Sequence, residues 1–132
     1  MQKIMIRGNL TADPILSERE WINKETGEIL KAKVCNFTVA AEDSHGERKR
    51  TEFFKVNVWR GFGELCAETL KKGHSVLVFG SVYLKNYTDK NNNHRSVMEI
   101  KPDAIEFLNG KTIKIEEDQP APIPEDTDGM DY

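Results

Sequence analysis

The chain has 132 residues, 31% of them charged and 38% hydrophobic, and a formal net charge of −3 at pH 7. That length suits one domain with a single core. Because no apolar run approaches the roughly 18 residues of a membrane helix, and the first residues lack a secretory signal, we expect a cytoplasmic protein that does not contact membranes.

The charge is divided unevenly along the chain. Residues 1–115 hold all 19 lysines and arginines against 15 aspartates and glutamates, a net charge of +4. Residues 116–132 hold seven acids and no base. A mildly basic body with an acidic end predicts two different partners, or one partner for which the acidic end competes.

Alternating apolar and polar residues, separated by turn-forming residues, predict strands over the first half of the chain. The segment 15–31 is an exception, because it is polar and charged with a turn signal at 25–27, and it predicts a long loop or a hairpin. In chain order, we expect a first strand over 2–10, a second over 32–42, a turn with three consecutive bases over 43–50, and a third strand over 51–60.

The third strand, TEFFKVNVWR, has two unlike faces. Alternate side chains of a strand point to opposite sides. Phe54, Val56 and Val58 therefore form one plainly apolar face, which predicts contact with a core. The opposite face carries Phe53 and Trp59 among polar residues, so two large rings are expected on the wetter side.

The period changes after the third strand. Residues 62–73 place apolar side chains at helical spacing, with Lys71, Lys72 and Gly73 suited to the C-terminal end of a helix. Residues 75–87 predict a fourth strand, in which Gly80 indicates a bulge or bend. A polar turn, a fifth strand over 95–101 and a short apolar segment over 104–108 complete the body.

The order of three strands, one helix and two strands predicts an OB-fold, an all-β five-stranded Greek-key barrel with one short helix between the third and fourth strands. We expect this domain to span residues 1–110. Beyond it hydrophobicity falls, and prolines and acids occur without a period. Residues 111–132 are therefore expected to be a disordered acidic tail.

Aromatic and basic residues share one parity on two predicted strands. Phe53, Lys55 and Trp59 alternate on the third, and Tyr83, Lys85 and Tyr87 alternate on the fourth. Stacking on an aromatic side chain is worth about 1–3 kcal/mol per base and tolerates any base. The alternative is that these rings cover a second small core or a subunit interface. Because both strands show the same pattern, we favour single-stranded nucleic acid.

Several lysine and arginine residues are candidates to contact phosphates, which would make the affinity for nucleic acid fall with added salt. Lys55 and Lys85 are favoured because they share parity with the rings, and the turn at 48–50 comes next. For most of the others, a solvated surface charge is the commoner role. The candidates are Lys3, Arg7, Arg48, Lys49, Arg50, Lys55, Arg60, Lys71, Lys72 and Lys85.

Catalytic and metal-binding motifs are not expected. The three histidines stand singly in different segments, and no acid pairs with a base or nucleophile in a recurring motif. Cys35 and Cys66 lie too far apart for a CxxC pair, so reduced, buried thiols are the expectation. We expect neither an enzyme nor a bound cofactor or metal.

The body resembles the bacterial single-stranded-DNA-binding proteins, the SSB family, over residues 2–108. The resemblance implies the OB-fold, assembly as a homotetramer and binding of single-stranded DNA. It places Phe53, Trp59 and Tyr87 at the family's main stacking positions, and Lys3, Lys72 and Lys85 where the family often has phosphate contacts. The segments that carry it, in family order, are KIMIRGNLTADP, VCNFTVAAE, TEFFKVNVW, LKKG and VLVFGSVYLKNYTD.

The chain also departs from the family. A further stacking Trp that some members have after the second strand has no clear counterpart, and Ser44 and His45 lie nearest to that position. The segment 17–31 is longer than the usual loop, so that Trp21 either compensates, packs, or touches another subunit. Family tails end in acids followed by Ile-Pro-Phe, whereas this chain ends Asp-Gly-Met-Asp-Tyr.

The expected function is binding of single-stranded DNA without marked sequence specificity, and protection of it, at the nucleoid. Stacking is assigned to Phe53, Trp59 and Tyr87, with Tyr83 as a fourth ring. The acidic tail is expected to recruit proteins of replication, recombination and repair, through Asp126, Asp128, Met130, Asp131 and Tyr132. The alternatives are an OB-fold adaptor of the replication or primosome machinery that binds protein, and a preference for RNA over DNA.

Overall fold

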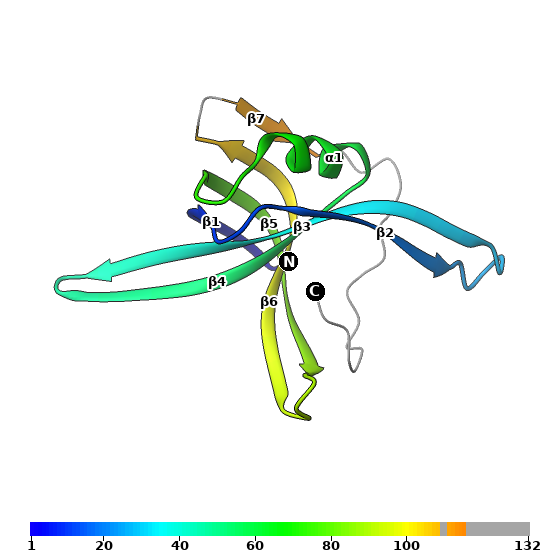
Figure 1. Cartoon of the computed structure of the whole chain (residues 1–132), viewed down its shortest axis with the longest axis horizontal. Coiled ribbons are helices and arrows are strands. Elements are labelled where there is room, and N and C mark those ends of the chain that lie inside the picture. Colours follow the sequence, from blue (N-terminus) through cyan, green and yellow to red (C-terminus); the bar gives the residue numbers. More distant parts are fainter. Residues whose placement is uncertain (109–110, 116–132) are drawn as a thin grey trace.

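The structure is a computed structural model that describes residues 1–108 and 111–115. The alternating runs of the sequence form strands that curl into a barrel, from which hairpins project in three directions (Figure 1). The elements are β1 (Lys3–Leu10), β2 (Ile15–Ile22), β3 (Ile29–His45), β4 (Arg48–Trp59), α1 (Arg60–Thr69), β5 (Ser75–Thr88), β6 (His94–Phe107) and β7 (Lys111–Lys114).

Hydrogen bonding connects the strands in the order β1-β5-β6-β4-β3-β2, and β1 also pairs with β3 at Asn9 and Leu10. This second pairing closes five strands, β1 and β3–β6, into a ring. The pairs are antiparallel except for β4 with β6, which run parallel. The helix α1 lies between the third and fourth strands of the ring, so the predicted OB-fold is confirmed.

The polar segment 15–31 forms a hairpin. β2 pairs with the first half of β3 from Ile22↔Ile29 to Ile15↔Asn36. The segment 43–50, in contrast, was assigned wrongly as a turn, since β3 and β4 stay paired as far as His45↔Arg48 and only two residues turn. A hairpin in solvent is polar on both faces, so its composition does not differ from that of a loop. Both hairpins extend well beyond the barrel, on opposite sides of it (Figure 1).

The helix and the last strands also differ in their bounds. α1 ends at Thr69 rather than near Gly73, because Leu70 is already extended and points into the core with 2% of its surface exposed. The predicted fifth strand and the apolar segment after it are one continuous strand, β6. The predicted bulge is confirmed between Phe79 and Gly80, where a Cβ on Gly80 would lie 2.2 Å from the carbonyl oxygen of Lys101.

The sheet continues past the expected end of the domain at residue 110. β7 pairs with the end of β6, from Phe107↔Lys111 to Ala104↔Lys114. Half-buried Ile115 then packs against the core cluster. Residues 116–132, which make up the rest of the predicted tail, lie outside the described residues.

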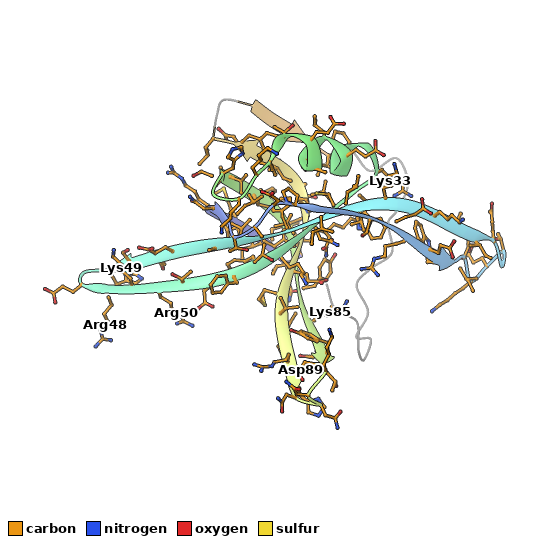
Figure 2. The ribbon with its side chains drawn as sticks, in the orientation of Figure 1. Lys33, Arg48, Lys49, Arg50, Lys85 and Asp89 are labelled. Carbon is orange, nitrogen blue, oxygen red and sulfur yellow. The ribbon has the colours of Figure 1, made fainter. Side chains whose placement is uncertain are left out.

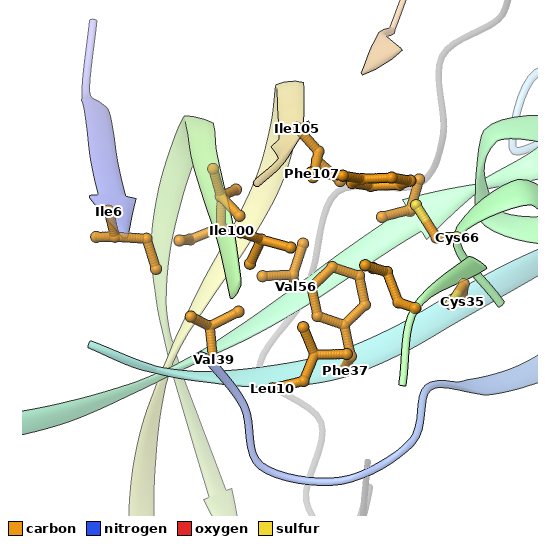
Figure 3. Packing of buried hydrophobic residues seen from close by; sticks show 14 residues of the cluster. Ile6, Leu10, Cys35, Phe37, Val39, Val56, Cys66, Ile100, Ile105 and Phe107 are labelled. Atoms are coloured by element: carbon orange, nitrogen blue, oxygen red, sulfur yellow. The ribbon is translucent and has the colours of Figure 1, made fainter. Parts of the chain in front are cut away.

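The core lies inside the ring and is closed at one end by α1. Apolar side chains of every ring strand and of the helix meet there, among them Phe37, Val56, Ile100 and Ile105 (Figure 3). Cys35 and Cys66 are free and fully buried in this cluster, as predicted. Burial raises the pKa of the Cys35 thiol to about 11 and that of Cys66 to about 12, which keeps both protonated and unreactive at neutral pH.

Gly63 allows α1 to pack closely against the barrel, and its replacement by alanine is expected to destabilise the fold. An added Cβ would lie 2.2 Å from the carbonyl oxygen of Val58 and 3.2 Å from the backbone nitrogen of Cys35. Overpacking of this kind costs about 1–3 kcal/mol. Gly61 is the matched control in the same helix, because nothing lies within 4 Å of its Cβ position.

Urea unfolding of the two variants measures this difference. Gly61→Ala should be neutral or stabilising by up to about 1 kcal/mol, the gain in helix propensity. Equal free energies of unfolding for Gly63→Ala and Gly61→Ala would show that the helix does not need this close approach.

Candidate nucleic-acid interface

The predicted aromatic residues of β4 and β5 lie on one continuous outer face, which also includes β6. Lys55 on β4 and Tyr83 on β5 are both register partners of Glu99 on β6, so the outward side chains of the three strands stand side by side. Phe53 is 58% exposed, whereas Val56 and Val58 behind it are fully buried. The predicted parity of this strand is therefore confirmed. We call this surface the aromatic face. Its accessible side chains are Phe53, Lys55, Trp59, Tyr83 and Tyr87, and on the same side Asn57, Lys85 and Glu99 are buried.

Trp59 occupies the end of β4, where the chain turns into α1. Arg60 follows with a left-handed backbone, φ of 64°, an uncommon conformation for a residue other than glycine. This abrupt reversal leaves the Trp59 ring half-buried at the margin of the aromatic face. Tyr83 and Tyr87, on the β5–β6 hairpin, are half-buried in the same way.

The three consecutive basic residues, Arg48, Lys49 and Arg50, lie at the far end of the β3–β4 hairpin, well away from the barrel (Figure 2). Lys49 is 3.8 Å from Glu42, and Arg50 is paired with Glu52, but the Lys49 and Arg50 side chains remain 74% and 82% exposed. Exposed ion pairs of this kind contribute little to stability. These bases can therefore exchange their carboxylate partners for phosphates.

The remaining candidate bases are spread over the barrel. Lys3 is close to the aromatic face, since it is the register partner of Ser81 on β5, and its Nζ lies 2.7 Å from Asp103. Arg7 and Lys72 are exposed at the opposite end of β5 from Tyr87. The backbone N–H of Lys72 donates a hydrogen bond to Oδ1 of Asp13. The structure thus brings Lys3 and Lys55 to the rings, but not Arg7 or Lys72.

Lys85 differs from its predicted role. It was favoured as a phosphate contact, but only 1% of its surface is exposed, so its ammonium group lies within the protein and not in the solvent. Lys85 does lie on the same side of β5 as Tyr83 and Tyr87, as its parity predicted. Parity does not reveal whether long side chains of neighbouring strands cover a position.

The sequence reasoning missed Glu99, a buried acid on the same side of the sheet as Lys85. It is fully buried on β6, and the positive charges of Lys85 and Lys55 act on it. Desolvation raises the pKa of the Glu99 carboxyl, and the two lysines and the amide of Asn57 oppose that rise. Only the register of β4, β5 and β6 brings these groups together, so no signal in the sequence alone would have identified Glu99.

Buried acceptors also gather beneath this face. In the part of the chain that the structure describes, the buried side-chain oxygens without a hydrogen-bond partner belong to Asn36, Asn57 and Glu99. Asn36 and Asn57 are register partners on β3 and β4. Uncompensated acceptors are costly in an apolar interior, and positive charge close by reduces that cost. Lys55 and Lys85 supply such charge to Glu99.

Trp21, for which the sequence left three roles open, packs on the aromatic face. Its ring contacts that of Trp59 edge-to-face, with centroids 5.8 Å apart and planes at 79°. It comes from β2 of the β2–β3 hairpin, which the sequence did not place relative to the rings. The contact adds a fifth aromatic side chain beside the four that were predicted.

A curled barrel with half-exposed rings on adjacent outer strands, and bases on a projecting hairpin, is the arrangement of an OB-fold protein that holds single-stranded nucleic acid. In the described residues, no group of histidine, cysteine and acidic side chains could hold a metal ion. Within the same part of the chain, no helix is long and apolar enough to cross a membrane.

Comparison with known proteins agrees with this class. The model of the single-strand binding protein family matches residues 1–108. The single-stranded DNA-binding protein of Caldanaerobacter subterraneus is 32% identical over 116 residues, 85% of this chain and 71% of that protein. Single-stranded DNA-binding protein 1 of Clostridium acetobutylicum is 29% identical over 84% of this chain and 96% of its own length.

The chain therefore belongs to the single-strand binding protein family. This family consists of binding proteins and not of enzymes, in agreement with the expectation from the motifs. The resemblance given by the sequence is confirmed over its whole predicted extent, residues 2–108.

Proposed function

We propose that this chain binds single-stranded DNA without marked sequence specificity and protects it. The observation that carries the proposal is the clustering of Phe53, Trp59, Tyr83 and Tyr87 on adjacent strands of one outer face. Rings of this kind stack on any base, since every base presents a π-face. The relatives described above are single-stranded DNA-binding proteins, which points to the same ligand.

In this proposal each part of the surface has a distinct role. Phe53 is the most exposed of the four rings and provides the first stacking platform. Lys3, Lys55 and the basic residues at 48–50 neutralise phosphates along the bound single-stranded DNA. Lys85 instead acts through its charge on buried Glu99, because its own side chain is buried and does not face the solvent. Arg7, Arg60 and Lys72 are left as weaker candidates.

Binding of fluorescently labelled oligonucleotides tests the proposal. Oligo-dT and mixed-sequence DNA of equal length should bind with similar affinity, and longer strands should bind more tightly until the site is filled. Oligo-U, measured beside oligo-dT, distinguishes DNA from RNA. Weak binding that does not depend on length would instead favour the protein-binding adaptor.

The recruiting role belongs to residues 116–132, which hold seven acids and no base. We propose that this segment recruits replication, recombination and repair proteins at the nucleoid, and that it competes with DNA for the basic surface. Deletion of residues 116–132 is expected to leave DNA affinity unchanged or slightly increased, measured by the same titration. Loss of binding on deletion would contradict this and give the segment a structural role.

We also propose that the chain assembles as a homotetramer, as the family resemblance implies. Met5 and Phe79 are register partners on β1 and β5, and both are exposed, by 66% and 42%. A contiguous apolar pair of this kind favours burial against another copy. Light scattering, with and without DNA, should give a mass of four chains, and a monomer at micromolar concentration would contradict the proposal.

A further inference from the structure

The β2–β3 hairpin continues the aromatic face beyond the barrel. Val34 on β3 is the register partner of both Trp59 on β4 and Ser17 on β2. Side chains that are paired across neighbouring strands lie on the same side of the sheet. Ser17, Arg19 and Trp21 alternate along β2, so all three belong to the side that carries Trp59.

The two faces of this hairpin differ in their charged residues, since only one of them carries acids. On the side away from Trp59, Glu20 pairs with Lys31 at 3.2 Å, and Lys33 pairs with Glu64 of α1 at 3.4 Å. On the side that carries Trp21, the paired residues of β2 and β3 include no acid and one base, Arg19. Only this second side suits a polyanion.

The geometry of the two indole rings limits what they can do together. A base between two parallel rings needs a centroid separation of roughly 7 Å, twice the usual contact distance. The Trp21 and Trp59 rings are 5.8 Å apart and nearly perpendicular, so that no base fits between them. The half-buried Trp21 ring is therefore available only as a separate surface, next to a base that stacks on Trp59.

We propose that Trp21 forms an additional base-stacking subsite, so that a single strand leaving Trp59 continues onto the β2–β3 hairpin. The inference rests on the proposed binding of single-stranded DNA. In this inference the extra length of the hairpin serves DNA binding, because the hairpin enlarges the stretch of single-stranded DNA that one copy of the chain covers.

The chain has only two tryptophans, and each can be observed alone. In the full-length Trp59→Phe variant all tryptophan emission comes from Trp21, and in Trp21→Phe it comes from Trp59. Each variant is titrated with oligo-dT of increasing length, while the anisotropy of a labelled oligonucleotide reports binding independently. We expect quenching of both tryptophans, with Trp21 requiring a longer oligonucleotide than Trp59.

The result separates this inference from the proposed function. Saturated binding with quenched Trp59 and unchanged Trp21 emission would overturn the subsite alone, whereas absence of binding by both variants and by the unaltered chain would overturn the proposed function. Trp21 emission that changes on dilution of the protein, but not on addition of DNA, would place the ring between copies and also overturn the subsite.

Affinity gives a second readout. Trp21→Ala should weaken binding of long oligonucleotides by roughly 5- to 150-fold, with little effect on the shortest that bind. Trp21→Phe should retain most of the affinity. Ile22→Ala is the matched control, because Ile22 is adjacent, 64% exposed and on the opposite side of the hairpin. An equal loss in Ile22→Ala would contradict the subsite and indicate a general effect on the hairpin.

Discussion

Replacement of Glu99 by alanine is expected to destabilise the domain by about 1–3 kcal/mol, because it removes a buried polar neighbour of Lys85, Lys55 and Asn57. Lys85 is 1% exposed and would lose the buried acid on which its positive charge acts. Urea unfolding at neutral pH measures the change. The fold would remain, but with much of its margin of stability removed.

Asp103→Ala is the control for this prediction. Asp103 pairs with Lys3 at 2.7 Å, but the two side chains are 46% and 33% exposed. An exposed pair of this kind contributes at most about 1 kcal/mol after screening by solvent. If Glu99→Ala cost no more than Asp103→Ala, the buried charges would not depend on each other.

The same carboxyl should make stability depend on pH. Desolvation raises the pKa of Glu99 above its ordinary value of 4.5, so the folded state binds this proton more tightly than the unfolded state. The stabilisation that comes from this tighter proton binding by Glu99 is therefore complete below pH 4.5, and it is lost as pH rises through the raised pKa. The free energy of unfolding relative to Glu99→Gln should fall over that range, and a difference that stayed constant or increased would be inconsistent with this shift.

Replacement of Trp59 by alanine is expected to weaken binding of oligo-dT by about 1–3 kcal/mol, which is roughly 5- to 150-fold. Trp59 lies at the margin of the aromatic face and contacts Trp21, so the substitution removes one platform and the neighbour of a second. The labelled-oligonucleotide titration measures the loss, with urea unfolding carried out in parallel.

Phe54→Ala separates stacking from packing. Phe54 is half-buried and packs against the core cluster, while its neighbour Phe53 faces outward. Phe54→Ala should therefore lower the free energy of unfolding and leave the affinity of the folded protein unchanged. If Trp59→Ala lowered stability and Phe54→Ala lowered affinity, the side chains of β4 would face the opposite way, as they do after a register shift of one residue.

The barrel could be predicted from the sequence because its signals are local. Phe54, Val56 and Val58 alternate with polar residues, and a strand that alternates in this way has only one side to turn toward a core. The bulge at Gly80 could be predicted for a similar reason. The bounds of the hairpins could not, because residues 43–50 are exposed on both faces and show no contrast that distinguishes paired strands from a turn.

The site was predictable only in part, because its details depend on contacts between distant strands. Parity placed Phe53, Trp59, Tyr83 and Tyr87 on the outer surface. Lys85 and Glu99 are both buried, and they come near each other only through the β5–β6 register, which pairs Lys85 with Val97 and Tyr83 with Glu99. Trp21 is likewise 38 positions from Trp59 in the sequence, and the two rings meet only because β3 pairs with both β2 and β4.

Tryptophan fluorescence during titration with poly-dT, at two salt concentrations, tests the proposed binding most directly. Stacking on the aromatic face predicts strong quenching. Neutralisation of phosphates by lysine and arginine predicts that higher salt shifts the titration to weaker affinity, because the counterions released on binding gain less entropy when the surrounding salt is more concentrated. Quenching that saturates at low salt and weakens at high salt is the expected result. Absence of quenching, or quenching indifferent to salt, would contradict the proposal.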